Sequence, residues 1–239
     1  RALNEGDVEI STVVRLGDRA LAQIQPRGAR VTLGAEVTLA QILRERDLAF
    51  LHPVVRSIGG PAVRTTATVG GNLFAPSPFG DLAVALLALD SVVSVQGGYG
   101  ARDMGLDEFL AGRDRNVGQL VLGVSFDRSP ASDAFRWRKA TRVKPKGAAV
   151  VSIAALVPNM GGRISGARIA YGAMAPTAIR AKAAERALEG RMLDEQGVSA
   201  AVAAAAEGTA PANDSIASAW YRREVVGVHL RRLLLGQSG

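Results

Sequence analysis

The residues best placed to do chemistry lie in one stretch, 68–82, which reads T-V-G-G-N-L-F-A-P-S-P-F-G-D-L between two apolar segments. Consecutive glycines let the backbone approach a ligand and turn its N–H groups toward one point, which suits phosphate oxygens. Thr68 and Asn72 flank Gly70 and Gly71, and their side chains can add hydrogen bonds. Asp81 offers an acceptor for a sugar hydroxyl or a ring N–H. The pattern is therefore consistent with a nucleotide site.

The same stretch also fits a wide turn between two core elements, in which Asp81 only caps the helix that follows. A single Gly-Gly pair is a weak signal, and the stretch matches neither G-x-G-x-x-G nor a P-loop. The residue types by themselves leave both interpretations open.

Composition limits where the chemistry can reside. The chain has 239 residues and no cysteine, which excludes disulfides, thiolate zinc sites and iron–sulfur ligation by this chain. His52 and His229, its two histidines, fall in separate predicted helices, which argues against a histidine metal centre. No apolar run approaches the roughly 20 residues that span a bilayer, and the start does not resemble a secretory signal. We expect a cytoplasmic protein whose chemistry belongs to a bound organic cofactor or to another subunit.

Charge is distributed unevenly along the chain. Residues 1–128 hold 13 basic and 14 acidic residues, whereas residues 129–239 hold 16 basic and 8 acidic ones. The densest basic run, 136–146, has six cations and no acid. Nucleic-acid binding would require aromatic partners beside them, and only Trp137 is present, alternating with arginines as a half-buried strand residue does. We therefore expect no nucleic-acid partner, and instead an anionic cofactor or an acidic partner protein.

The first part of the chain predicts a mixed α+β region. The pattern indicates strands at 31–36, 91–95 and 119–126, helices at 39–43 and 50–57, and an apolar helix at 82–89 with Asp81 as its N-cap. Thr38 and Gln41 form a capping box, and Pro53 fits the first turn of its helix. Residues 127–133, D-R-S-P-A-S-D, are the expected boundary.

The second part predicts a three-stranded antiparallel sheet followed by helices. Strand patterns occupy 135–141, 148–157 and 168–174, with a Gly161-Gly162 turn before the third. Helical patterns follow at 178–188, 198–207 and 216–235. Each of the three ends in a glycine, at Gly190, Gly208 and Gly236, which is typical of a helix C-cap.

Two segments carry a family resemblance. Residues 57–90, S-I-G-G-P-A-V-R-T-T-A-T-V-G-G-N-L-F-A-P-S-P-F-G-D-L-A-V-A-L-L-A-L-D, resemble the signature of the FAD-binding subunit of molybdenum hydroxylases, which include xanthine dehydrogenase and carbon monoxide dehydrogenase. Residues 167–181, A-R-I-A-Y-G-A-M-A-P-T-A-I-R-A, resemble that family's A-R-I-A-x-G-G-V-A-P-T-P-x-R-A. The two matches occur in the family's order.

The resemblance implies a fold and a set of contacts. The fold is an FAD-binding domain of the vanillyl-alcohol-oxidase (PCMH) type over 1–128, then an α+β domain over 129–239. Main-chain amides of the 68–72 turn would hold the FAD pyrophosphate. The cofactor-binding residues implied are Ile58, Thr68, Val69, Gly70, Gly71, Asn72, Phe74, Ser77, Asp81, Leu120, Val121 and Arg138. The family's other phosphate-binding loop would lie upstream of Arg1, so we expect the FAD-binding domain to be incomplete at its N-terminal end.

The function implied is that of a medium-sized flavoprotein subunit. In the family, a large subunit carries the molybdenum cofactor, a small subunit carries two [2Fe–2S] clusters, and FAD passes electrons to an acceptor such as NAD. We expect a dimer of such heterotrimers, no metal ligated by this chain, and no membrane span. Two alternatives stay open, a scaffold subunit of the same complex that has lost FAD and a free-standing nucleotide-binding protein.

Overall fold

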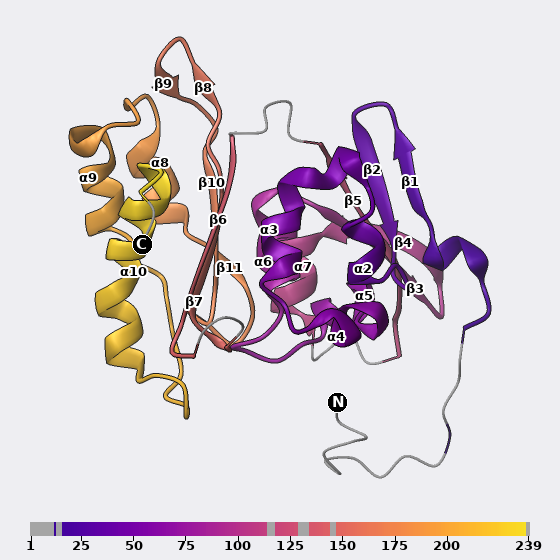
Figure 1. Cartoon of the computed structure of the whole chain (residues 1–239). Coiled ribbons are helices and arrows are strands. Elements are labelled where there is room, and N and C mark those ends of the chain that lie inside the picture. The colour runs from indigo at the N-terminus through magenta and orange to yellow at the C-terminus, as the bar shows by residue number, and fades with distance from the viewer. Residues whose placement is uncertain (1–11, 13–15, 114–117, 129–133, 144–146, 238–239) are drawn as a thin grey trace.

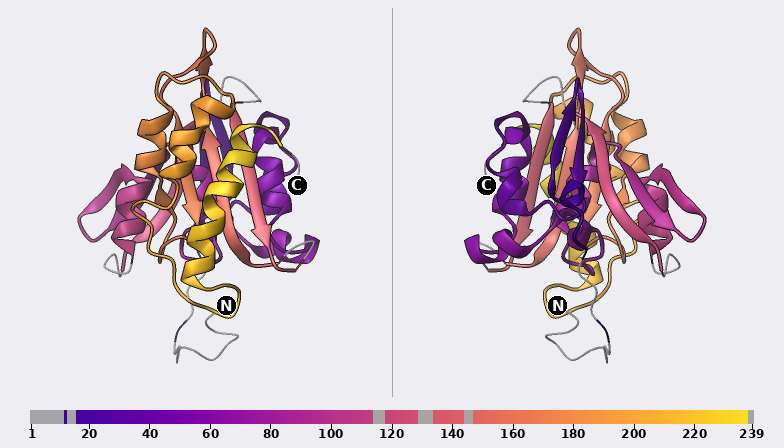
Figure 2. Two further views of the ribbon diagram at one scale, coloured as in Figure 1. Left: turned by 90° about the vertical axis from the view of Figure 1, so that its left-hand side faces the viewer. Right: turned by 90° about the vertical axis from the view of Figure 1, so that its right-hand side faces the viewer.

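The computed structural model describes residues 12, 16–113, 118–128, 134–143 and 147–237. These residues form four layers in the order helices, sheet, helices, sheet (Figure 1). The C-terminal helices lie on the outer face of one sheet, and the helices of the first part lie between the two sheets (Figures 1 and 2).

The first sheet has five antiparallel strands in the order β1-β2-β5-β3-β4. Their bounds are β1 Ile24–Arg27, β2 Arg30–Gly34, β3 Val92–Gly97, β4 Gly100–Gly105 and β5 Leu120–Asp127. The three strands expected from the sequence are confirmed, whereas β1 and β4 had no clear signal. Residues 129–133 of the expected boundary lie outside the described residues.

Short helices cover the inner face of this sheet. They are α2 Leu39–Ile42, η2 Arg46–Leu51, α3 His52–Arg56, α4 Pro61–Thr66, α5 Val69–Leu73, α6 Asp81–Ala88 and α7 Leu106–Ala111, whereas η1 Arg19–Ala22 lies at the edge of the sheet against β2. The predicted capping box of α2 is confirmed, because Thr38 Oγ1 accepts from the Gln41 N–H and Gln41 Oε1 accepts from the Thr38 N–H. Pro53 lies in the first turn of α3, as predicted.

The second sheet has four antiparallel strands in the order β11-β10-β7-β6. Strands β6 Phe135–Thr141, β7 Ala149–Leu156 and β10 Arg168–Gly172 are the three that the sequence predicted. The fourth, β11 Ile179–Arg180, pairs with β10 through two residues, too few to leave a periodic signal. Strands β8 Asn159–Met160 and β9 Arg163–Ile164 form a separate hairpin around the predicted Gly161-Gly162 turn.

Three helices cover the outer face of the second sheet. They are α8 Lys182–Leu188, α9 Glu195–Ala203 and α10 Ala219–Leu234. Gly190 and Gly236 directly follow the C-caps of α8 and α10 with φ of 71° and 66°, a backbone conformation that favours glycine where a helix ends. The predicted stop of the second helix at Gly208 is wrong, because α9 begins at Glu195 and already ends at Ala203. The expected helix at 178–188 begins four residues late because its first residues form β11.

Helix α6 joins the two parts of the chain. Every residue from Asp81 to Leu89 is buried, and α6 contacts both β7 and β10 of the second sheet. The core around α6 contains Leu33, Val93 and Val124 of the first part together with Phe135, Ala154 and Ala170 of the second. The apolar core therefore continues across residue 128.

Candidate functional site

The Gly-Gly stretch forms a single helical turn, α5. Thr68 is its N-cap, and Thr68 Oγ1 accepts from the Gly71 N–H at 3.1 Å. The Gly70 N–H donates to the Ala35 carbonyl at 2.8 Å, and the Val69 N–H donates to the Val37 carbonyl at 2.9 Å. In this structure the three amides that the predicted phosphate nest would use therefore donate to acceptors within the chain. A turn of helix that docks on β2 engages the same N–H groups that a phosphate would need.

Gly70 and Gly71 have different surroundings and therefore different roles. A Cβ on Gly70 would lie 3.1 Å from the Ala35 carbonyl oxygen and 3.2 Å from the Ala35 Cβ, so Gly70 lets α5 approach the end of β2. Gly71 is exposed, and an added Cβ would meet only Thr68 Oγ1, at 3.2 Å. The outer side of Gly71 is the side from which a ligand can reach this turn.

Asn72, rather than Asp81, completes the start of α6. Asn72 Oδ1 accepts from the Ala83 N–H at 3.0 Å, one of the N–H groups that the helix leaves unpaired. The N-cap position itself is Gly80, with φ of 94°, and Asp81 is the first helical residue. The prediction that Asp81 caps this helix is therefore wrong, and its carboxylate is directed elsewhere.

Asp81 pairs with Lys139 of β6. Asp81 Oδ2 lies 2.7 Å from Lys139 Nζ, with only 6% and 10% of the respective side chains exposed. The same ammonium donates to the Ser57 carbonyl at 3.2 Å. Asp81 Oδ1 is buried and has no hydrogen-bond partner among the described residues. A buried carboxylate oxygen without a donor is unfavourable, so this atom is a candidate acceptor for a ligand group.

Ile58 lies in the loop next to this ion pair. The loop is held by Arg64, which is 8% exposed and donates from one guanidinium nitrogen to the carbonyls of Ile58 and Gly59, at 3.1 and 2.6 Å. The Ile58 side chain is partly buried and packs against the core around α6. Lys139 brings Ile58 and Asp81 together. Its ammonium donates both to Asp81 Oδ2 and to the carbonyl of Ser57, the residue that precedes Ile58.

Leu120 and Val121 lie where β5 begins, close to the Gly-Gly turn. Ala35 connects them, because its N–H donates to the Leu122 carbonyl and its carbonyl accepts from the Gly70 N–H. Val121 is buried in the core, whereas Leu120 is half-buried on the other face of the strand. Of the two, Leu120 has the more accessible side chain.

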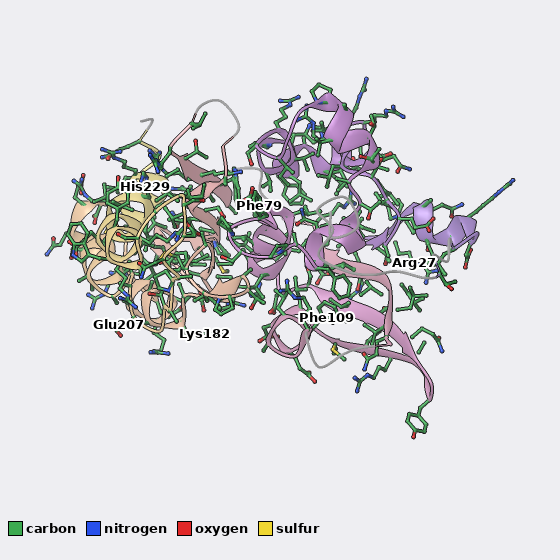
Figure 3. The ribbon with its side chains drawn as sticks, turned by 90° about the horizontal axis from the view of Figure 1, so that it is seen from below. Arg27, Phe79, Phe109, Lys182, Glu207 and His229 are labelled. Carbon is green, nitrogen blue, oxygen red and sulfur yellow. The ribbon has the colours of Figure 1, made fainter. Side chains whose placement is uncertain are left out.

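The end of the stretch borders a narrow hollow between the two parts of the chain. Its lining includes Asn72, Ser77 and Phe79 from the first part and Gly172, Ala173 and Thr177 from the second. Phe79 is 45% exposed and lies near the junction of the two parts (Figure 3). Phe74 is 46% exposed, and its ring packs edge-on against Phe109 at 5.7 Å.

Arg138 stands apart from this group. Its guanidinium donates to His229 Nδ1 at 3.1 Å and to the Gln237 carbonyl at 3.1 Å, both on the side of α10. Burial lowers the pKa of Arg138, and the nearby cation of Arg232 adds to this. Adjacent residues of a strand point to opposite faces, so Lys139 reaches the Asp81 side and Arg138 does not. Trp137 and Lys139 are two residues apart, so they share the face of β6 opposite to that of Arg136 and Arg138. This alternation is visible in the sequence and could have identified Lys139.

Two protein-family models match the chain. Residues 1–127 match the FAD binding domain in molybdopterin dehydrogenase, and residues 136–236 match the CO dehydrogenase flavoprotein C-terminal domain. The chain belongs to this family of FAD-binding subunits. It is a medium-type FAD subunit of an oxidoreductase, and the α+β fold inferred from the sequence is confirmed.

Individual relatives agree with this assignment. The chain is 29% identical over 224 residues to the carbon monoxide dehydrogenase medium chain of Afipia carboxidovorans, covering 91% of this chain and 77% of the relative. It is 28% identical over 207 residues to the glyceraldehyde dehydrogenase medium chain of Sulfolobus acidocaldarius, covering 83% and 72%. A reconstituted CO dehydrogenase from Oligotropha carboxidovorans has a chain of the same fold, with a TM-score of 0.81 and 27% identity over 92% of this chain and 80% of that one.

The residues of this FAD subunit fit its cofactor in two respects. Asp81 Oδ1 lacks a donor, and the outer side of Gly71 is open where a side chain would stand in the way. The occupied amides of Gly70 and Gly71 do not fit the pyrophosphate contact that we predicted. Within the described ranges, no three His, Asp or Glu side chains gather as a metal site, and no helix is long and apolar enough to cross a membrane.

Proposed function

We propose that this subunit receives electrons from [2Fe–2S] clusters of a small partner subunit and delivers them, through FAD, to an external acceptor such as NAD. In this scheme a large partner subunit oxidises the substrate at its molybdenum cofactor. The observation that carries the proposal is the unpartnered Asp81 Oδ1 beside the Gly-Gly turn, in a chain of the FAD-binding family. FAD supplies the redox chemistry, and the protein supplies placement and electrostatics.

Residues from three segments would hold the cofactor. Thr68 retains a hydroxyl hydrogen to donate, and Gly71 leaves room for close approach. Asp81 Oδ1 is an acceptor for an N–H or a hydroxyl. Ile58 and Leu120, both half-buried, offer apolar surface on either side of the turn. Phe74 and Ser77 border the same region, and Ser77 makes no hydrogen bond to any described residue, so its hydroxyl is available.

The partner arrangement proposed is a dimer of heterotrimers. The medium chains among the relatives support a multi-subunit enzyme. The excess of basic over acidic residues in 129–239 suits docking to acidic surfaces of partner subunits.

Spectroscopy of the purified complex tests the proposal. We expect the visible absorbance of oxidised flavin, FAD equimolar with this chain, bleaching by the substrate, and reoxidation when the acceptor is added. Bleaching that NAD does not reverse would remove NAD as the acceptor while leaving the flavin role intact. Equimolar FAD that the substrate cannot bleach would remove this flavin from the electron path.

One observation favours a second candidate, a scaffold subunit without FAD. The amides of Gly70 and Gly71 are both engaged by protein acceptors, as expected of a turn with no phosphate to bind. An assembled complex that is colourless in the flavin region, and takes up no FAD when it is added, would support the scaffold.

A further inference from the structure

A row of residues crosses the second sheet directly opposite α6. Lys139 of β6 pairs with Ser152 of β7, and Ser152 pairs with Gly172 of β10. A Cβ on Gly172 would touch both Ser152 Oγ and Val84 of α6, so this row faces α6. Asp81 lies one turn before Val84 on the same helix face, where Lys139 meets it. A cation of the second part of the chain is therefore placed on a carboxylate of the first part.

The contacts of Lys139 fix the orientation of the Asp81 carboxylate. The ammonium donates to Asp81 Oδ2 at 2.7 Å and is itself fixed by the Ser57 carbonyl at 3.2 Å. A buried carboxylate without a cation is strongly disfavoured. With Oδ2 occupied by Lys139, Oδ1 is left as the acceptor that no described residue uses.

We propose that Lys139 is a positioning residue for the flavin cofactor, holding the Asp81 carboxylate turned so that Oδ1 can accept a hydrogen bond from FAD. This inference rests on the proposed function, and extends it by making FAD retention depend on the second part of the chain. Lys139 acts through Asp81 and does not itself touch the cofactor.

A purely structural role for the ion pair makes a different prediction. If Lys139 only stabilised the contact between the two parts, its loss would weaken FAD binding through the fold, whatever residue occupied position 81. If Lys139 acts through the Asp81 carboxylate, its loss matters only while that carboxylate is present. A double-mutant cycle separates the two roles.

The experiment measures the FAD dissociation constant of the complete complex after removal and re-addition of FAD, for Lys139→Met, Asp81→Asn and the double variant. We expect Lys139→Met to weaken FAD binding by about 10- to 100-fold, the effect of losing a hydrogen bond to a charged group. We expect the double variant to bind FAD as Asp81→Asn does. Lys182→Met is the matched control, since Lys182 is exposed at the outer edge of the C-terminal helices (Figure 3) and should leave the dissociation constant unchanged.

The outcomes separate the proposals. If the unmodified complex binds no FAD, the proposed function fails. If it binds FAD and Lys139→Met binds FAD equally well, only the positioning role fails. Should Lys139→Met not fold because of an unpaired buried carboxylate, Asp81→Asn and the double variant, which both lack that charge, still decide the question. A double variant that binds FAD tenfold more weakly than Asp81→Asn overturns the positioning role.

Discussion

Asn72 and Ala83 are eleven residues apart in sequence, yet the side-chain oxygen of Asn72 accepts the backbone N–H of Ala83 at 3.0 Å. This bond connects the Gly-Gly turn to the first turn of α6. Asn72→Ala should lower the free energy of unfolding by about 0.5–2 kcal/mol, as expected for loss of a helix cap. Urea denaturation measures this, with Asn159→Ala in the exposed β8–β9 hairpin as the control. Equal stability of the two variants would show that the bond contributes nothing.

Gly70 and Gly71 should respond differently to valine. Gly70→Val forces a side chain against Ala35 and should destabilise the fold by about 1–3 kcal/mol, the usual range for overpacking. Gly71→Val places its side chain outward, so the melting temperature of the FAD-free protein should barely change while FAD retention is lost. Thermal unfolding and FAD stoichiometry are the two measurements. Equimolar FAD in a folded Gly71→Val variant would show that the cofactor does not approach the turn from this side.

Gly172 and Ser152 offer a test of the packing opposite α6. A Cβ on Gly172 would lie 2.4 Å from Ser152 Oγ and 2.7 Å from Val84 Cγ2, so Gly172→Ala should cost about 1–3 kcal/mol of stability. Ser152→Ala alone should be neutral or slightly stabilising, because Ser152 Oγ is buried without a partner among the described residues. Combining the two should restore part of the loss. Gly60→Ala, at φ of −83° with nothing near its Cβ, is the control in urea denaturation.

His229 should make stability depend on pH. Burial, followed by the cations of Arg138 and Arg232, lowers the pKa of His229 below its ordinary value. In the folded chain Nδ1 accepts from Arg138, which a protonated ring cannot do. The unfolded chain therefore takes up this proton first, so the stability due to neutral His229 is present above about pH 6.5 and is lost as the pH falls from there through the folded pKa.

The matched variant is His229→Gln, whose side-chain oxygen can still accept from Arg138. We expect the free energy of unfolding of the native protein to fall more between about pH 7.5 and about pH 5.5 than that of His229→Gln. Urea titrations at the two pH values make the comparison. Equal pH dependence in the two proteins would assign the effect to other groups.

Local signals in the sequence predicted local structure well. The Thr38 capping box, the glycine stops after α8 and α10 and the long strands of the second sheet all depend on residues within a few positions of one another, and all are present. The family resemblance supplied the cofactor, and the residues that it assigns to the cofactor site stay a prediction.

What the sequence did not reveal concerns partners that are distant in sequence or a shift of one residue. The N–H of Ala83 is capped from Asn72, on another helix, which no local pattern reveals. Lys139 and Arg138 are adjacent cations, and a one-residue shift in a strand reverses the face that each side chain occupies. The Gly70 N–H donates to the carbonyl of Ala35, 35 residues earlier in the chain. Only the folded chain shows that this N–H is already engaged.

No face of helix α6 is exposed to solvent. Strands β7 and β10 of the second sheet and helices α3, α5 and α7 of the first part pack against it, and its core includes side chains from before and after residue 128. A fragment ending near that residue would present one flank of α6 to water as an apolar strip prone to aggregation. The two regions that match family models, 1–127 and 136–236, are thus expected to unfold in a single transition. A gene rearrangement could transfer them only together.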